Sequence, residues 1–289
     1  MDRPLRIGTR GSPLALIQAR MVAEALRAAH GWNETAIELV PITTSGDVIR
    51  DRPLAEVGGK ALWTRELDAC LADGRTDLSV HSMKDVETIR PETFAIAAML
   101  ERADTRDRLI GADSIEKLPQ GATVGTSSPR RAAQLRARRP DLRTVSIRGN
   151  VQTRLAKVAR GEVDATLLAA AGLDRLGIEV GAPLDLLPAP AQGAIGVEIS
   201  ADRGDLRDLL AAIDHRPTHE AVTAERAFLA ALGGDCHSAV AALAGGGLLR
   251  AEILSSDGSE VRAGEGVPEE LARRLLAAAS PALRAMFAR

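Results

Sequence analysis

Aromatic side chains are scarce in this 289-residue chain, which has two Trp, three Phe and no Tyr. Its cores must therefore be built from Leu, Val, Ile and Ala, and a ligand site made by stacking on aromatic rings is not expected. The length allows two or three domains, each able to bury a core without disulfides or metals.

Useful cysteine patterns, long apolar runs and a large net charge are also missing. The two cysteines, Cys70 and Cys236, show no zinc-binding or disulfide spacing, so we expect no metal site. No apolar run approaches membrane-spanning length and no signal-peptide core is found, which predicts a cytoplasmic protein. A formal net charge of -2 argues against nucleic acid or a membrane as a partner, and nothing requires more than a monomer.

Lysine is rare as well, because 33 of the 37 basic residues are arginine. Arginine binds carboxylate or phosphate through two parallel hydrogen bonds, so clustered arginines favour an anionic ligand. Phosphate is less favoured, since the chain has neither a Gly-x-x-x-x-Gly-Lys loop nor a Gly-x-Gly-x-x-Gly fingerprint. A codon preference for Arg and Ala is the alternative explanation.

A short apolar run between Asp77 and Asp85 ends in ionisable residues. Alternating polar and apolar residues predict a strand up to His81, and a hydroxyl, an ammonium and a carboxylate follow at Ser82, Lys84 and Asp85. Chemistry tends to lie at such strand ends, which makes Asp85 the candidate reacting group. A solvated ion pair of Lys84 and Asp85 on a loop is the alternative.

Two motifs occur twice in the same order. The strand, Gly-Thr and Ser-Pro pattern of Ile7–Pro13 returns with one small change at Thr123–Pro129, and the Gly-x-x-Asp at 74–77 returns at 161–164. Each Ser-Pro predicts a helix with a serine N-cap and proline at its first position. The repeats predict two similar α/β domains with mostly parallel sheets and ligands near the strand ends.

The rest of the chain suggests where these domains end. The charged segment 101–107 is predicted to cross out of the first domain, and a strand at 195–198 to return to it. We expect domains at 1–101 plus 194–214, at 102–193 and at 215–289, the last a small α+β domain. The weakly periodic segment 43–61 is predicted to be a mobile lid with Lys60 facing the ligand.

The second Ser-Pro is followed at once by Arg130 and Arg131. The N–H groups at the start of a helix stabilise a bound anion by only ~0.3–1 kcal/mol. Hydrogen bonds from arginine stabilise it by roughly 1.5–3 kcal/mol each. The two arginines therefore predict an anion site, with a solvent-facing basic helix start as the alternative. Further arginines at predicted strand ends and loops are Arg10, Arg148, Arg154 and Arg175.

Cys236 follows two glycines at a predicted helix end, next to Asp235 and His237. We expect its thiol on an accessible loop. The members of a catalytic triad converge from distant positions, whereas these three residues are adjacent. The residues alone therefore favour an inert loop cysteine, just as they favour simple core packing for Cys70.

Together these motifs resemble the porphobilinogen deaminase family, also called hydroxymethylbilane synthases, over almost the whole chain. The resemblance implies two α/β domains like those of periplasmic binding proteins plus a small C-terminal α+β domain. It implies a transferase that condenses porphobilinogen head to tail, with loss of ammonia, into the linear tetrapyrrole hydroxymethylbilane. The matching segments are Arg-Ile-Gly-Thr-Arg-Gly-Ser-Pro-Leu-Ala at 6–15, Val-Gly-Gly-Lys at 57–60, Val-His-Ser-Met-Lys-Asp-Val at 80–86, Val-Gly-Thr-Ser-Ser-Pro-Arg-Arg at 124–131, Arg-Gly-Asn-Val at 148–151 and Val-Thr-Ala-Glu-Arg at 222–226.

The resemblance also implies roles for single residues. Family enzymes carry a dipyrromethane cofactor on a cysteine that matches Cys236, which reverses the interpretation of this residue as inert. Asp85 matches the catalytic carboxylate. Because each pyrrole brings two carboxylates, a growing chain accounts for the arginines better than codon preference does. The implied cofactor-binding residues are Ser82, Lys84, Thr126, Ser128, Arg130 and Arg131, and the implied substrate-binding residues are Arg10, Ser12, Lys60, Arg148, Arg154, Arg175 and Gln192.

The chain departs from the family pattern at a few positions. Trp63 stands where Phe is common, and Pro129 where Leu is frequent. Asp235 and Ala239 replace a usual Gly and a usual Pro beside Cys236. The alternative function is a non-catalytic binding protein for a polyanionic small molecule, which does not explain Cys236.

Overall fold

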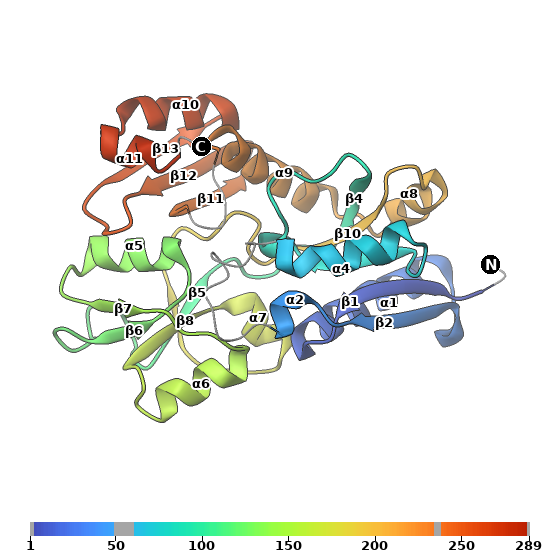
Figure 1. Ribbon diagram of the computed structural model, residues 1–289, viewed down its shortest axis with the longest axis horizontal. Helices are drawn as coiled ribbons and strands as arrows, with labels where there is room; N and C mark the ends of the chain where they lie inside the picture. Colours follow the sequence, from blue (N-terminus) through green and yellow to red (C-terminus); the bar gives the residue numbers. More distant parts are fainter. Residues whose placement is uncertain (1–2, 49–60, 234–237, 288–289) are drawn as a thin grey trace. The chain divides into compact units, whose positions relative to one another are not determined.

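A computed structural model describes residues 3–48, 61–233 and 238–287 of the chain (Figure 1). Contacts divide the chain into two compact units, Met1–Ala103 with Gly193–Glu220, and Asp104–Gln192 with Ala221–Arg289. No helix within the three described ranges is both long and apolar enough to cross a bilayer. The predictions for Lys60, for Cys236 and for most of the 43–61 lid fall outside these ranges.

The first unit is built on a five-stranded sheet in the order β2-β1-β3-β10-β4. β1 is parallel to β2 and β3, whereas β10 is antiparallel to β3 and β4. Leu, Ile, Val and Ala side chains from the sheet, α1 and α8 form its core. The elements are β1 (Leu5–Arg10), α1 (Pro13–His30), η1 (Glu34–Ala36), β2 (Ile37–Ile42), α2 (Ser45–Val48), α4 (Ala61–Ala72), β3 (Leu78–Ser82), η2 (Met83–Asp85), β4 (Phe94–Met99), β10 (Ile195–Ser200), α8 (Gly204–Leu210) and η3 (Ala211–Ile213).

The second unit contains another five-stranded sheet, in the order β7-β6-β8-β5-β9. β6 is parallel to β7 and β8, and β5 is antiparallel to β8 and β9. The elements of this part are β5 (Asp107–Ile110), β6 (Thr123–Gly125), α5 (Pro129–Arg138), β7 (Arg143–Val145), α6 (Val151–Ala159), β8 (Ala165–Ala169), α7 (Ala170–Arg175) and β9 (Ala182–Leu184).

The predicted internal repeat is confirmed in three dimensions. In both sheets three parallel strands are followed by a strand that runs antiparallel to its neighbours. The repeated aspartates do the same work, since Asp77 accepts a hydrogen bond from the backbone N–H of Arg6 at 2.8 Å and Asp164 from that of Thr123 at 2.6 Å. Each aspartate thus fastens the start of one parallel strand to its neighbour.

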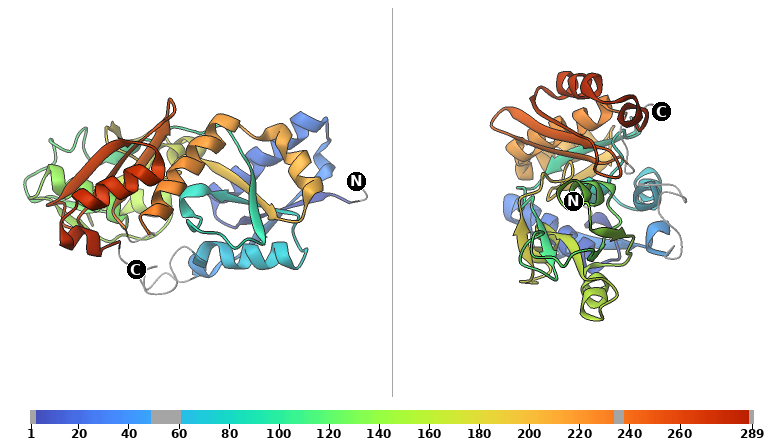
Figure 2. Two further views of the ribbon diagram at one scale, coloured as in Figure 1. Left: turned by 90° about the horizontal axis from the view of Figure 1, so that it is seen from above. Right: turned by 90° about the vertical axis from the view of Figure 1, so that its left-hand side faces the viewer.

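A third sheet, β11-β12-β13, lies in the second unit and is wholly antiparallel. Figure 1 and the right-hand view of Figure 2 show α10 along one face of this sheet. On the α5 side, Ala133 packs with Ala239 and Leu254. The elements of this part are α9 (Arg216–Ala231), β11 (Val240–Gly245), β12 (Leu248–Leu254), β13 (Val261–Gly266), α10 (Pro268–Ala278) and α11 (Pro281–Ala285).

Several local predictions are confirmed and two are wrong. Ser12 and Ser128 are helix N-caps, β10 returns to the first sheet, and Cys70 is buried. The prediction of mostly parallel sheets is wrong for one strand of each sheet: four strands run in the same direction, whereas β10 and β5, each between two others, run against them. The prediction that the whole charged segment 101–107 crosses between domains is also wrong at its last residue. Asp107 is the first residue of β5, and Arg130 and Arg131 neutralise its charge inside the second unit.

Candidate functional site

A small cavity, about 70 Å³, lies at the end of β3 in the first unit. We call it the β3 cavity. Four residues singled out from the sequence line it, namely Arg10, Ser12, Ser82 and Asp85. The structure therefore brings together side chains from the ends of β1 and β3, as the predicted strand-end site requires. The other lining residues are Leu14, Ala15, Gln18, Trp63, Thr64, Val80, His81 and Val86.

Asp85 lies in η2, a single turn held in place by its apolar neighbours. Met83 and Val86 are buried, and the backbone N–H of Met83 donates to the carbonyl of Ala194 at 3.1 Å. A Cβ at Gly196 would lie 2.1 Å from Met83 Sδ, so this glycine leaves room for the methionine. Lys84 and Asp85 are both half-buried, which disfavours the alternative of a freely solvated ion pair.

Ser82 joins this turn to α1. Its hydroxyl lies 2.8 Å from Nε2 and 3.0 Å from Oε1 of Gln18, a buried glutamine. Gln18 was not predicted as a site residue. The repeat contained the signal, because Gln18 and Gln134 both lie six positions after the repeated serine.

Arg10 lies over the ring of Trp63, with its guanidinium carbon 3.8 Å from the ring centroid. Trp63 in turn packs closely on Gly46, where a Cβ would meet the ring at 2.4 Å. A cation over a Trp face is stabilised by roughly 0.5–2 kcal/mol. Trp63 therefore orients Arg10 at the β3 cavity. The sequence pointed to this contact only by having Trp63 where Phe is common in the family.

A buried charged network borders the same cavity. His81 Nε2 lies 3.0 Å from Oε2 of Glu198, a fully buried carboxylate that also accepts hydrogen bonds from Arg90 at 2.8 and 3.0 Å. Burial opposes ionisation of Glu198, but His81 and Arg90 outweigh this effect and lower its pKa to about 2. The carboxylate is thus ionised at neutral pH, and the guanidinium of Arg90 supplies the opposite charge.

Arg130 and Arg131 form the centre of a second polar cluster, in the second unit. Arg130 Nη1 donates to Asp107 Oδ2 at 2.8 Å, and Arg131 Nη2 donates to Asp107 Oδ1 at 2.7 Å. Gln192 Nε2 donates to the same Oδ1 at 2.8 Å. The side chains of Arg130 and Arg131 are only 3 % and 7 % exposed. The alternative of a solvent-facing basic helix start is therefore wrong.

The pKa values in this cluster follow from its burial and its charges. Burial alone would raise the pKa of Asp107, but Arg131 and Arg130 outweigh it and hold that pKa well below its usual range. Burial lowers the pKa of Arg130, and the charge of Asp107 opposes that effect. The Nε atoms of Arg130 and Arg131 are buried and make no hydrogen bond within the described ranges. Two buried guanidinium donors are thus left without a hydrogen-bond partner in the part of the chain that the structure describes.

Four other predicted site residues lie in the second unit: Thr126 directly after β6, Arg148 between β7 and α6, Arg154 near the start of α6 and Arg175 at the end of α7. Thr126 Oγ1 accepts from the backbone N–H of Ser128 at 3.2 Å. Arg154 Nε donates to the carbonyl of Gly149 at 3.0 Å, and Arg148 is half-buried. Burial lowers the pKa of Arg175 to about 10.

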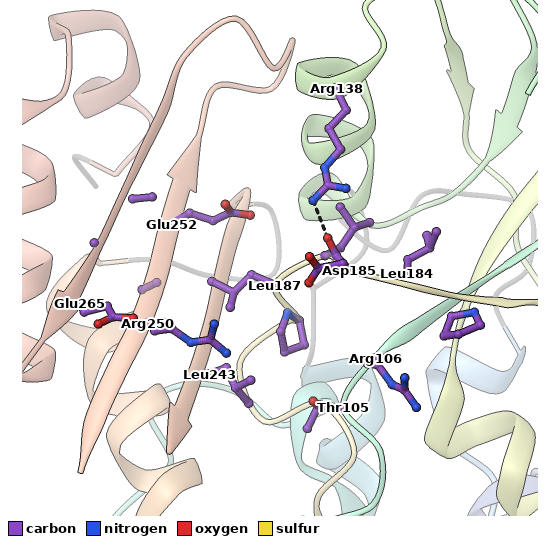
Figure 3. A pocket seen from close by; sticks show the side chains of 16 residues that line it. Thr105, Arg106, Arg138, Leu184, Asp185, Leu187, Leu243, Arg250, Glu252 and Glu265 are labelled. Atoms are coloured by element: carbon purple, nitrogen blue, oxygen red, sulfur yellow. Dashed lines mark hydrogen bonds between the residues drawn. The ribbon is translucent and has the colours of Figure 1, made fainter. Parts of the chain in front are cut away.

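A larger cavity, about 690 Å³, also lies in the second unit, between β9 and its following loop and β11–β13 (Figure 3). In its wall, Arg138 donates to the backbone carbonyl of Asp185. Three arginines and three carboxylates line it, so its charges balance. None of the residues predicted from the sequence lies in its wall.

The amino-acid sequence is similar to known proteins over most of its length. A family model described as "Porphobilinogen deaminase, dipyromethane cofactor binding domain" matches residues 5–208. A porphobilinogen deaminase of Sphingopyxis alaskensis is 61 % identical over 99 % of this chain and 98 % of its own length. One of Paracoccus denitrificans is 54 % identical over 92 % of this chain and 88 % of its own length. The chain belongs to the porphobilinogen deaminase family.

Solved structures of periplasmic binding proteins show a weaker similarity. A nutrient-binding protein of Burkholderia cenocepacia bound to methionine matches 78 % of this chain and 95 % of its own, at 14 % identity and a TM-score of 0.45. A periplasmic substrate-binding protein of an ABC transporter from Coxiella burnetii matches 77 % of this chain and 96 % of its own, at 15 % identity and a TM-score of 0.44. The assignment to the family rests on the sequence relatives.

Proposed function

We propose that this chain is a transferase that condenses porphobilinogen units head to tail, releases ammonia and forms hydroxymethylbilane. The observation that carries the proposal is the β3 cavity, where Arg10, Ser12, Ser82 and Asp85 meet in a chain of this family. A carboxylate beside a guanidinium and two hydroxyls suits a substrate that carries carboxylates and becomes cationic as it reacts. A non-catalytic binder of polyanions would not need the carboxylate.

Asp85 is the proposed catalytic group. Loss of ammonia from porphobilinogen leaves a cationic methylene-pyrrole, and an ionised carboxylate can stabilise that charge. At a separation of ~4 Å and an effective dielectric of ~20, the attraction is about 4 kcal/mol. Met83 and Val86 hold η2 in place, so Asp85 does not have to reorganise as the charge forms.

The Asp107 cluster fits the dipyrromethane cofactor that the family carries. The carboxylates of the dipyrromethane would accept hydrogen bonds from the buried Nε donors of Arg130 and Arg131. Their negative charge would also offset the free-energy cost of burying two guanidinium groups. When bound, the dipyrromethane supplies the terminal pyrrole to which incoming units are joined. Its proposed covalent anchor is Cys236, and the further residues proposed to hold it are Ser82, Lys84, Thr126 and Ser128.

Arginines beyond this cluster are proposed to bind carboxylates of the substrate and the growing chain. Trp63 holds the guanidinium of Arg10 flat, which prepares it for a carboxylate. The buried Gln192 would act through Asp107, by keeping that carboxylate in place. The remaining residues of this proposed set are Ser12, Lys60, Arg148, Arg154 and Arg175.

We also propose a division into three domains, at 1–101 plus 194–214, at 102–193 and at 215–289. Three separate apolar cores support it, because each consists of residues from only one of these segments. A monomer in the cytoplasm completes the proposal. Light scattering of the purified chain should give the mass of one 30.4 kDa chain plus its cofactor.

Intact-mass measurement and turnover test the function together. The purified chain should carry an adduct equal to two porphobilinogen units less two molecules of ammonia, and should convert porphobilinogen into hydroxymethylbilane. Cys236→Ser should lose both the adduct and turnover. A chain that has no adduct and no activity, even after preincubation with porphobilinogen, would refute the proposal. Unchanged binding of porphobilinogen by Cys236→Ser, with no turnover by either form, would favour the polyanion binder.

A further inference from the structure

Arg90 lies five residues after Asp85 and belongs to none of the segments that match the family pattern. We propose that Arg90 is a positioning residue that clamps the 83–90 segment and so fixes Asp85 at the β3 cavity. The catalytic part of this inference rests on the proposed function of Asp85. The mechanical part, the clamp itself, does not.

The guanidinium of Arg90 is the hub of three ion pairs. It binds both oxygens of Glu198, Nε at 2.8 Å and Nη2 at 3.0 Å. Nη2 also donates to Asp68 Oδ1 at 2.6 Å, and Nη1 donates to Glu87 Oε2 at 3.0 Å. The Arg90 side chain is only 9 % exposed and Glu198 is fully buried, so solvent screens the pair weakly.

These partners come from different parts of the first unit. Glu198 lies in β10 and Asp68 in α4, so Arg90 fastens the 83–90 segment to a central strand and to a covering helix. Glu87 extends the contact, because its Oε1 accepts a hydrogen bond from Thr64 of α4 at 2.8 Å. Thr64 itself lines the β3 cavity, which connects the clamp to the cavity wall.

Arg90 holds the end of the 83–90 segment that has no apolar anchor in the core. Met83 and Val86 anchor the first end in the core, whereas Ile89, next to Arg90, is 79 % exposed. Loss of Arg90 would remove the three ion pairs that hold this second end. Asp85 lies between the two ends, so looseness at the second would displace its carboxylate.

Lysine cannot replace this arginine. A bidentate pair with Glu198 together with bonds to Asp68 and Glu87 requires the planar fork of a guanidinium, whereas an ammonium is a compact point charge. Misplacement of a reacting group by about 1 Å can cost about 10²-fold in rate. The clamp therefore predicts a loss of kcat in variants that keep Asp85, Arg10 and the cofactor-binding residues intact.

The test compares Arg90→Met and Arg90→Lys with the matched control Arg3→Met. Arg3 also forms a bidentate pair, with Asp77 at 2.7 and 2.6 Å, in the same unit, but its side chain is 53 % exposed and does not line the β3 cavity. We expect kcat to fall about 10- to 100-fold in Arg90→Met and at least about fivefold in Arg90→Lys, with KM within threefold and the cofactor adduct retained. Arg3→Met should keep kcat within about twofold.

Amide hydrogen exchange across 83–90 gives the readout that does not depend on activity. We expect it to be at least about tenfold faster in Arg90→Met than in wild type or Arg3→Met, because opening of this segment is no longer opposed. If Arg90→Met does not fold, Asp68→Asn, which weakens one of the three ion pairs of Arg90 at a residue outside the lining of the β3 cavity, should show the same changes on a smaller scale.

The outcomes separate the two parts of the inference. Unchanged exchange in the 83–90 segment would overturn the clamp, and faster exchange with unchanged kcat would overturn its positioning role. A wild-type chain that makes no hydroxymethylbilane would refute the proposed function, while the exchange measurement would still decide whether the clamp exists.

Discussion

Asp107→Asn should destabilise the second unit strongly, because Asp107 is the shared partner of two buried arginines. Asparagine keeps the shape of the side chain and one oxygen acceptor. The other carboxylate oxygen is replaced by an NH₂ group, which is a donor. This NH₂ faces the guanidinium of Arg130, at 2.8 Å, or that of Arg131, at 2.7 Å. One of the two charge-assisted hydrogen bonds is therefore lost, and both cations lose the opposite charge.

The size of the effect follows from the burial of all three groups. Removing one partner of a buried ion pair typically costs about 3–5 kcal/mol, since the other charge stays buried without compensation. Asp107 is fully buried and the two arginines nearly so. We therefore expect the free energy of unfolding to fall by about 3–5 kcal/mol. In an Arg130→Met, Arg131→Met background the same change should cost less than about 1 kcal/mol, because no unpaired cation is left.

Urea unfolding followed by circular dichroism, with hydrogen exchange of β6 and β8 amides, measures this loss. The sign of the pH dependence is fixed by the lowered pKa of Asp107. Its stabilisation is complete above the pKa of an unfolded Asp, about 3.9, and is lost only as the pH falls below that value. The difference between wild type and variant should thus be constant from about pH 5 to 8 and shrink below about pH 4. A loss under about 1 kcal/mol at pH 7 would refute the shared-partner interpretation.

Three further outcomes are expected. Asp85→Asn should keep KM within about threefold but lower kcat about 10²- to 10³-fold in steady-state assays with porphobilinogen, since about 4 kcal/mol of charge stabilisation disappears; normal turnover would exclude the carboxylate as the reacting group. Glu198→Gln should be less stable than wild type at pH 6, and the gap should close as acid brings the pH from about 4 toward the pKa of about 2; a gap independent of pH would contradict an ionised Glu198. Trp63→Leu should raise KM about two- to tenfold through the loss of its contact with Arg10, whereas Trp63→Phe should stay nearer wild type; equal KM values would show that the ring does not orient the guanidinium.

The sequence predicted the parts of the fold that depend on local signals. Serine followed by proline is enough to place an N-cap, so the starts of α1 and α5 were found to the residue. The return of β10 to the first sheet was found because its apolar run stands between turn residues. Lys84 and Asp85 were placed at a strand end for the same reason.

The parts that were missed depend on contacts between distant residues. β5 begins with a charged residue, and only Arg130 and Arg131, more than 20 positions later, make Asp107 acceptable inside a sheet. Neither Arg90 nor Glu198 has a local signal, since an isolated charge in a sequence is usually on the surface. Burial of such groups becomes visible only when their partners are known.

Comparison of the two copies of the repeat explains why one has a cavity where the other has cations. Leu14 and Ala15 of the first copy correspond to Arg130 and Arg131 of the second, two and three positions after the repeated serine. The sheet registers show that Ile195 and Asp107 are a third pair of equivalent residues. Ile195 lies opposite Ser82 in the first sheet, and Asp107 lies opposite Ala169, the equivalent of Ser82, in the second.

The exchange of three apolar residues for two arginines and an aspartate is therefore a coupled change at equivalent positions of one scaffold. In the first unit the apolar set leaves space, and Leu14 and Ala15 line the β3 cavity beside Asp85. In the second unit the charged set forms a buried cluster in which Asp107 accepts from both arginines, and their Nε donors have no partner among the described residues. Neither arginine could be added to the first copy alone, because Ile195 would leave a buried cation unpaired. The duplicated fold thus supplies two different environments, a cavity lined by a carboxylate and a buried cluster of two guanidinium groups, which fit the roles proposed for Asp85 and for Arg130 and Arg131.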